Sequence, residues 1–191
     1  GDPLGSGFVA SLARPGGNIT GVSGTGNEAN VKTLELIREV VPQVRRVAQL
    51  ANANDPFTKG LVEQTLRAAG TLGIELRVHM IRGPGDIEGA LAMIAQEQSQ
   101  AVLIQGSLPV QPTVDLALKY RLLALSQQAS MAKAGALMAY SSSYAERGKV
   151  VAGYVDKILK GAKPAELPVQ QPTRYDLVVN LRTAKLLGLT I

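Results

Sequence analysis

The chain has no cysteine, no tryptophan and a single histidine among its 191 residues. Without cysteine, thiol catalysis, thiolate zinc sites and iron–sulfur ligation are excluded. Any Ser-His-Asp triad would have to use His79, and a metal site with two histidines is impossible. The acidic residues show no D-x-D or E-x-x-H spacing, so we expect neither a metal nor another cofactor.

Aromatic residues are also scarce, and no apolar run approaches the roughly 18 residues that a membrane span requires. The net charge is +5, but lysine and arginine are dispersed along the chain. Their densest clusters, 45–46 and 157–163, contain no interleaved aromatic residue. This pattern favours a solvated basic surface over a nucleic-acid-binding one. The composition as a whole is that of a folded globular protein.

Short apolar runs alternate with amphipathic segments, which predicts an α/β fold with a parallel sheet flanked by helices. The expected strands are 46–51, 74–81, 101–105, 122–126, 136–140 and 175–179. The expected helices are 6–13, 28–41, 56–72, 87–98, 112–121, 144–160 and 181–187. The capping signals at helix starts are Asp55, Asp86, a capping box from Ser143 to Glu146, and Asn180. The stop signals at helix ends are Gly73, Gly161 and Gly188.

Candidate ligand contacts follow from this fold, because the crevice of an open parallel sheet lies beyond the carboxyl ends of its strands. The side chains expected there are Asn52, Asn54, Asp55, Phe57, Ser107, Gln127, Tyr140 and Ser141. In the first loop, free N–H groups of Phe57 and Thr58 are expected to face an anion at the helix start. The alternative is that Asn54 and Asp55 are only turn and cap residues.

Two other features have simpler structural interpretations. The stretch Gly21–Gly26 lacks the Lys-Ser/Thr of a phosphate-binding P-loop and lies outside dinucleotide register, which favours a flexible linker. His79 falls within an expected strand, with no nucleophile elbow or paired aspartate nearby, which favours a structural or edge-exposed histidine over a catalytic base. No pattern in the chain carries a reaction, so we expect a protein that is not an enzyme.

Several longer segments resemble one protein family. They are 1–7, 11–21, 136–140, 154–164, 167–172, 177–181 and 183–191, and the most specific are RPGGN at 14–18 and KILKG at 157–161. These segments resemble the ABC-transporter substrate-binding proteins that include members binding tryptophan and other aromatic amino acids. The resemblance covers essentially the whole chain.

The resemblance implies a type I periplasmic-binding-protein fold, in which two α/β lobes are joined by three crossovers, here near 20–24, 140–143 and 169–173. The expected parts are 1–23 (remnant of lobe 1 and first crossover), 24–140 (lobe 2), 141–168 (remnant helix of lobe 1) and 169–191 (crossover strand and last helix of lobe 2). The chain is thus expected to be a fragment with one complete lobe. Apolar remnant residues, namely Phe8, Val9, Leu12, Val151 and Tyr154, should be exposed and cause self-association.

The resemblance further implies the solute-capturing component of an ABC importer, which closes about a hinge and meets the membrane only through a permease. A periplasmic or extracytoplasmic location follows, and whether the protein carries a lipid anchor stays open. The loop 52–54 corresponds to a strand-end loop of the family that faces the cleft, and Asp2 to a strand end on the other lobe. Relatives often carry Pro-Asp or Thr-Asp-Asn where this chain has 105–108 as QGSL. An amino acid and a different small polar solute therefore both stay open as ligands.

Two alternatives belong to other functional classes. The effector-binding domain of a transcription repressor has the same fold, and a helix-turn-helix upstream would support it. A transferase on a doubly wound sheet is the other, and it would need an acid/base residue that the sequence does not offer.

Overall fold

The computed structural model describes residues 2–24 and 26–191. The chain divides into two compact units: unit 1 comprises residues 1–26 and 142–176, and unit 2 comprises 27–141 and 177–191. The chain therefore passes between the units three times. Gly1 and Thr25 lie outside the described residues, and with them the first residue of the expected segment 1–23 and part of the Gly21–Gly26 stretch.

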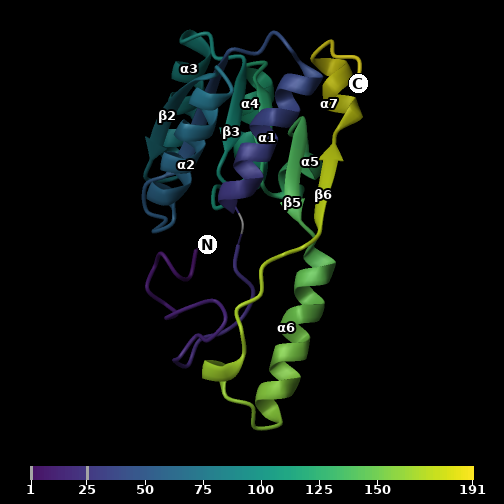
Figure 1. Cartoon of the computed structure of the whole chain (residues 1–191). Helices are drawn as coiled ribbons and strands as arrows, with labels where there is room; N and C mark the ends of the chain where they lie inside the picture. The colour runs from purple at the N-terminus through teal and green to yellow at the C-terminus, as the bar shows by residue number, and fades with distance from the viewer. Residues whose placement is uncertain (1, 25) are drawn as a thin grey trace. The chain divides into compact units, whose positions relative to one another are not determined.

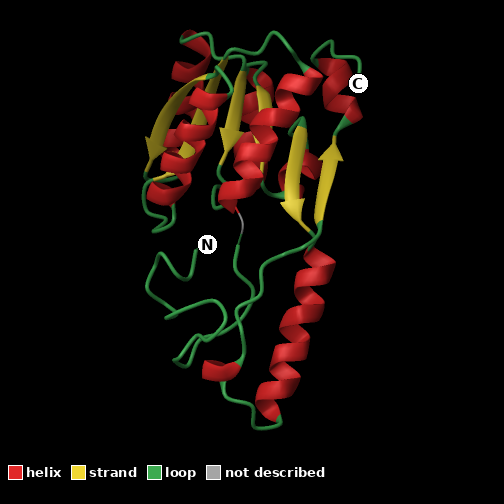
Figure 2. Ribbon diagram, viewed as in Figure 1, coloured by secondary structure: helices red, strands yellow, loops and turns green. Residues whose placement is uncertain are grey.

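A six-stranded sheet with the order β2-β1-β3-β4-β5-β6 is the centre of unit 2. Its strands are β1 (Arg46–Asn52), β2 (Glu75–Ile81), β3 (Ala101–Ile104), β4 (Leu123–Ser126), β5 (Met138–Ser142) and β6 (Tyr175–Val179). β1 pairs in parallel with β2 and β3, β3 with β4, and β4 with β5. Figure 2 shows β6 running opposite to β5 at the edge of the sheet. The expected α/β fold with a mostly parallel sheet is confirmed.

Helices cover both faces of this sheet (Figure 1). Those of unit 2 are α1 (Gly26–Val40), α2 (Thr58–Thr71), α3 (Ile87–Gln96), α4 (Val110–Lys119), α5 (Ala129–Ala134) and α7 (Leu181–Leu186), with a short 3₁₀ turn at Pro84–Asp86. The short helix α5 was not expected from the sequence, and the other five were. In the described part of the chain, no helix has the length and apolar character needed to cross a bilayer.

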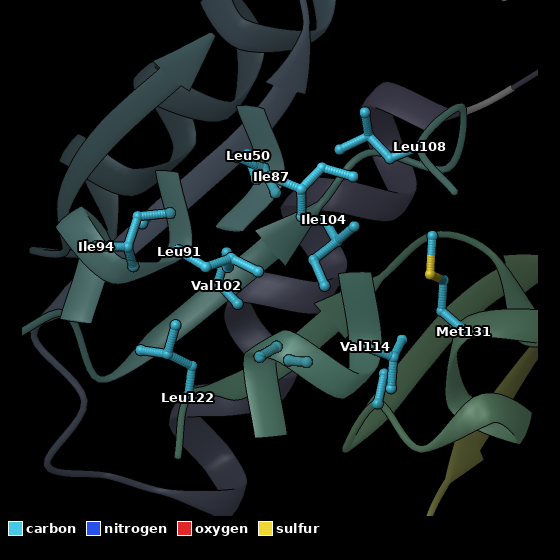
Figure 3. Packing of buried hydrophobic residues seen from close by; sticks show 14 of the residues in the cluster. Leu50, Ile87, Leu91, Ile94, Val102, Ile104, Leu108, Val114, Leu122 and Met131 are labelled. Atoms are coloured by element: carbon cyan, nitrogen blue, oxygen red, sulfur yellow. The ribbon is translucent and has the colours of Figure 1, made fainter. Parts of the chain in front are cut away.

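Two hydrophobic clusters lie on opposite faces of the sheet. On one face, Leu50 and Ile104 pack with residues of α3, α4 and α5, as Figure 3 shows for Leu91, Val114 and Met131. On the other face, strand residues pack with α1, α2 and α7, and the members include Leu34, Ile37, Val47, Ala69, Leu103, Leu125 and Ala184. Because both faces are covered, β3 and β4 are buried along their whole length and appear in the sequence as continuous apolar runs.

Most of the expected helix ends are present. The three glycines predicted to stop helices have left-handed backbones, with φ of 64° at Gly73, 97° at Gly161 and 74° at Gly188. Asn180 caps α7 as predicted, because its Oδ1 accepts a hydrogen bond from the backbone N–H of Thr183 at 3.0 Å.

Three of the predicted capping interactions are wrong. Asp55 does not cap α2, which begins at Thr58 with no side-chain cap bond. Ser143 precedes the helix that starts at 144 but makes no side-chain cap bond, and Glu146 pairs with Lys149 at 3.1 Å instead of reaching back. Asp86 precedes α3, yet its Oδ2 accepts from the backbone N–H groups of 82–83, which lie before it in the chain. The carboxylates of Glu146 and Asp86 each interact instead with another donor that is close in the sequence.

Unit 1 contains α6 (Tyr144–Leu159) and a 3₁₀ turn at Pro164–Glu166. The helix predicted from Ser6 to Ala13 is wrong, because residues 3–8 form turns. The backbone N–H groups of Phe8 and Val9 both donate to the carbonyl of Pro3, and Gly7 has φ of 71°, which a right-handed helix does not allow.

Two segments predicted to be crossovers, 20–24 and 169–173, lie side by side in unit 1. Val22 and Gln170 form a parallel bridge. The N–H of Ser23 donates to the carbonyl of Gln170 at 2.8 Å, and the N–H of Gln170 donates to the carbonyl of Gly21 at 2.9 Å. The segments far apart in the sequence are thus tied together by backbone hydrogen bonds.

Of the apolar residues of unit 1 that were expected to be exposed, only some are. Phe8 and Val151 are exposed, at 52% and 48%, and Leu12 is partly buried. Val9 and Tyr154, however, are buried, which contradicts the prediction. Tyr154 is the one described residue of α6 that is buried, because its hydroxyl donates to a backbone carbonyl of the extended passage that follows the helix.

Candidate functional site

The strand order places a topological switch between β1 and β3. After β1 the chain continues to β2 on one side, and it then returns to β3 on the other side. The helices that follow β1 and β3 contribute to opposite faces of the sheet, α2 to one hydrophobic cluster and α4 to the other. The strand ends beside such a switch point are where open α/β sheets bind ligands.

The loop after β1 is held by its own polar side chains. Asn52 Oδ1 accepts from the N–H of Asn54 at 3.0 Å, and Asn54 Nδ2 donates to the carbonyl of Arg82, just beyond β2, at 2.7 Å. Asp55 Oδ1 accepts from the N–H of Phe57 at 2.9 Å. Asn54 and Asp55 therefore do act as turn residues, which was the simpler of the two interpretations of this loop.

The predicted anion site at the start of α2 is wrong. The N–H of Phe57 bonds to the Asp55 carboxylate, and the N–H of Thr58 donates to the Asp55 carbonyl at 3.0 Å. Both donors that were expected to be free are therefore used within the loop, because α2 begins at Thr58 after an additional turn.

The loop after β3 meets the loop after β1 through one side chain. Gln105 is 4% exposed, and its Oε1 accepts from the N–H of Asn52 at 2.9 Å while its Nε2 donates to Asp55 Oδ2 at 2.9 Å. Exposed Ser107 follows, with its Oγ 3.5 Å from Asn52 Nδ2. The structure thus brings together Asn52, Asp55 and Ser107, which the sequence indicated, with Gln105, which it did not. The only sequence signal for Gln105 was its position directly after a buried strand.

The strand end of β4 adds further amides. Ser126 Oγ donates to the carbonyl of Ile104 at 3.0 Å and accepts from the N–H of Gln128 at 3.2 Å, which joins this strand end to that of β3. The Oε1 atoms of Gln127 and Gln128 are buried and have no hydrogen-bond donor among the described residues. Gln128 also lies against Gly106, where a Cβ would come within 3.1 Å of its Oε1.

At the end of β5, Tyr140 is partly buried and Ser141 is 5% exposed. Lys32 of α1 has a raised pKa, chiefly because it donates a hydrogen bond to Glu35 and is attracted to that carboxylate at 2.9 Å, with a smaller contribution from Tyr140. These residues belong to unit 2, as do all the other strand-end candidates.

Asp2 belongs to unit 1. Its Oδ1 accepts from the N–H groups of Leu4 and Gly5, at 3.1 and 3.0 Å, and so stabilises the first turn of the chain.

His79 lies away from these strand ends, in the middle of the edge strand β2. Its Nε2 is 3.2 Å from Glu97 Oε2, so it takes part in a local ion pair when protonated. This is the structural histidine that the sequence favoured. Within residues 2–24 and 26–191, no three His, Asp or Glu side chains gather in a way that could hold a metal ion.

The family model for the ABC transporter substrate binding protein matches residues 1–191. The chain belongs to this family. The resemblance noted from the sequence is therefore confirmed, as is the periplasmic-binding-protein-like fold. Substrate-binding proteins of ABC transporters bind small solutes and work with a permease, and they are typically extracytoplasmic.

Three relatives illustrate the match. A tyrosine-binding protein of Clostridioides difficile (strain R20291) is 25% identical over 194 residues, which cover 98% of this chain and 55% of that protein. The structure of an ABC domain from Streptococcus pneumonia in complex with L-Trp superposes with a TM-score of 0.91 at 24% identity, covering all of this chain and 65% of the other. A conserved domain protein from Vibrio cholerae O1 biovar eltor str. N16961 gives 0.92 at 28% identity, covering all of this chain and 64% of the other. This substrate-binding protein chain thus spans 55–65% of the length of these relatives.

Proposed function

We propose that this substrate-binding protein captures a small polar solute for an ABC importer, with an aromatic amino acid as the first candidate. The observation that carries the proposal is the polar cluster of Asn52, Gln105 and Ser107 at the switch point between β1 and β3. The relatives support the choice of ligand, since one is a tyrosine-binding protein and another was solved with L-Trp.

The proposed contacts on unit 2 are Asn52, Asn54, Asp55, Phe57, Ser107, Gln127, Tyr140 and Ser141. Their amides and hydroxyls both donate and accept hydrogen bonds, which suits a polar solute. The rings of Phe57 and Tyr140 offer apolar surface for an aromatic side chain. The buried Oε1 of Gln127 has no hydrogen-bond donor in the described part of the chain, and a ligand N–H or O–H would satisfy it.

We propose that units 1 and 2 are parts of the two lobes of a binding protein and that hinge closure buries the solute, with Asp2 as a contact from unit 1. The chain passes between the units three times, which supports a hinge. Two bodies joined by only a few connecting segments can move as rigid units relative to each other. The hydrogen-bonded segments 20–24 and 169–173 would move as one strap.

The same proposal implies a location outside the cytoplasm and a permease as the partner. It also implies that the protein catalyses no reaction and binds no nucleic acid. Amides and hydroxyls dominate the proposed site, while His79 is engaged with Glu97 elsewhere. A signal peptide or lipobox encoded ahead of Gly1 would agree with this location. A helix-turn-helix there would instead favour the repressor alternative.

The test is calorimetric titration and thermal shift of the full-length protein against L-tyrosine, L-tryptophan, L-phenylalanine and small organic acids. Ser107→Ala should weaken the binding of the amino acid that gives the strongest signal by about three- to tenfold, the value of one hydrogen bond. Thr190→Ala removes an exposed hydroxyl near the end of the chain and should leave the affinity unchanged. No heat and no thermal shift from any compound of the panel would overturn the proposal.

We also expect this chain to self-associate, with the exposed apolar stripe of α6 packing against a second copy. Val151, Val155 and Ile158 are 48%, 50% and 37% exposed, and their spacing places them on one stripe of α6. Light scattering over a concentration series should show a mass that rises with concentration. Val151→Glu combined with Val155→Glu should give the monomer mass throughout, whereas Leu181→Glu on α7 should not change the series. A monomer at every concentration for the unaltered chain would contradict the expectation.

A further inference from the structure

Gln105 has a buried side chain whose amide is used at both ends. Its Oε1 accepts from the N–H of Asn52 at 2.9 Å, and the hydroxyl of Thr58 donates toward the same oxygen at 3.0 Å. Its Nε2 donates to Asp55 Oδ2 at 2.9 Å. Its own backbone N–H donates to the carbonyl of Leu50 in β1 at 3.1 Å, which anchors the residue to the neighbouring strand.

These partners span the whole connection from β1 to α2. Asn52 is the last residue of β1, Asp55 lies in the middle of the loop, and Thr58 is the first residue of α2. The single hydroxyl hydrogen of Thr58 is shared between Gln105 Oε1 and the Asn52 carbonyl, which lies closer at 2.6 Å, so the start and end of the loop are closed on each other. A single side-chain amide directly after β3 therefore links three points of the loop that follows β1.

We propose that Gln105 is a positioning residue that fixes the 52–58 loop, and with it Asn52 and Asp55, in the arrangement that receives a ligand. The inference rests on the proposed function for its consequence in binding, but the geometry itself involves no ligand. Gln105 acts through the loop rather than through contact with the solute.

The chemical requirement is specific to an amide. One end must accept, because it meets an N–H and a hydroxyl, and the other end must donate, because it meets a carboxylate. Leucine would leave the partly buried N–H of Asn52 and the Asp55 oxygen without this partner, which costs stability to the extent that these groups are shielded from water. An ionised glutamate would keep the accepting end and place a second negative charge against Asp55.

Glutamate at this position also provides a test that depends on pH. Of the described residues, Asp55 is the titratable group hydrogen-bonded to Gln105. Two carboxyls at this separation share one proton, and the pKa of one of them rises. When protonated, the introduced carboxyl can again donate to Asp55 while its other oxygen accepts from Asn52. At low pH, Gln105→Glu should therefore regain the hydrogen bond to Asp55 that it lacks at neutral pH.

The ligand-free measurement is the hydrogen-exchange protection factor of the Asn52 amide. We expect it to fall about tenfold or more in Gln105→Leu at every pH. In Gln105→Glu it should fall less at roughly pH 7.5, because one carboxylate oxygen still accepts from Asn52 while the other repels Asp55, and it should return toward the unaltered value at about pH 5. Gln111→Glu is the matched control, because Gln111 Nε2 also donates to an aspartate, Asp115 Oδ1 at 2.8 Å, on an exposed face of α4.

The second measurement is the affinity for L-tyrosine and L-tryptophan of the full-length protein carrying the same substitutions. Gln105→Glu should bind about tenfold more weakly at neutral pH and recover on acidification, while Gln111→Glu follows the unaltered chain throughout. Loss of protection in Gln105→Leu without any binding by the full-length unaltered protein would refute the proposed function but leave the positioning role in place. Unchanged protection and affinity in Gln105→Leu would overturn the positioning role. If that variant does not fold, Gln105→Glu decides, and the absence of a pH-dependent recovery overturns the inference.

Discussion

Replacing Leu125 by alanine is expected to lower the free energy of unfolding by about 2–5 kcal/mol. Leu125 is fully buried in β4, in register with Leu103 on one side and Met138 on the other. It belongs to the cluster that α1 covers with Leu34 and Ile37. A parallel sheet buried on both faces cannot relax to fill the space, so both the lost transfer free energy and the cavity contribute. Urea denaturation followed by circular dichroism measures the change.

Leu186→Ala is the control for this experiment. Leu186 is 63% exposed on α7, in the same unit, so the same atoms are removed from a site in contact with water. Its unfolding free energy should change by no more than about 0.5 kcal/mol. Equal losses in the two variants would contradict the assignment of Leu125 to the core.

Gly135→Ala is expected to cost about 2–4 kcal/mol of stability from two separate sources. Gly135 has φ of 125°, a conformation that residues with a Cβ rarely adopt. A Cβ there would also lie 3.2 Å from both Leu118 Cδ1 and Val114 Cγ1 of α4. The backbone cannot simply move away, because the Gly135 carbonyl accepts from Thr183 Oγ1 at 2.8 Å.

Gly70→Ala separates these causes from the general effect of adding a methyl group. Gly70 is exposed within α2, and a Cβ there would meet nothing within 4 Å. Alanine should therefore stabilise the protein by about 0.5–1 kcal/mol through helix propensity. A thermal unfolding series of both variants gives the two signs directly, and a neutral Gly135→Ala would show that the turn after α5 adapts.

The secondary structure could be predicted well wherever the signal is local. The strand 175–179 has the predicted bounds, and Asn180 caps the helix that follows it. Alternation of apolar runs, caps and stop glycines is a property of neighbouring residues and is therefore legible in a single sequence. The helix α5 was missed although α7 of the same length was predicted, because Asn180 marks the start of α7 as a side-chain cap whereas Gln128 makes no side-chain cap bond before α5.

Errors arose where a local signal competed with another partner. Ser143 and Glu146 have the spacing of a capping box, but Glu146 pairs with Lys149. Tyr154 was expected to be exposed, yet its hydroxyl finds a backbone carbonyl and the ring is buried. Such choices between partners depend on small free-energy differences that spacing alone does not report.

The sequence alone was sufficient to determine the α/β class and the family, and it predicted a binding site in the strand-end loops. Periodicity and motif are written in consecutive residues, and the rule that strand ends collect ligands needs only the order of elements. The tertiary structure decided which strand ends meet, and it added Gln105, whose amide reaches Asn52 and Asp55 about 50 positions earlier in the chain. A buried side chain takes its role from the donors and acceptors that folding brings within about 3 Å of it, and no local pattern encodes that distance.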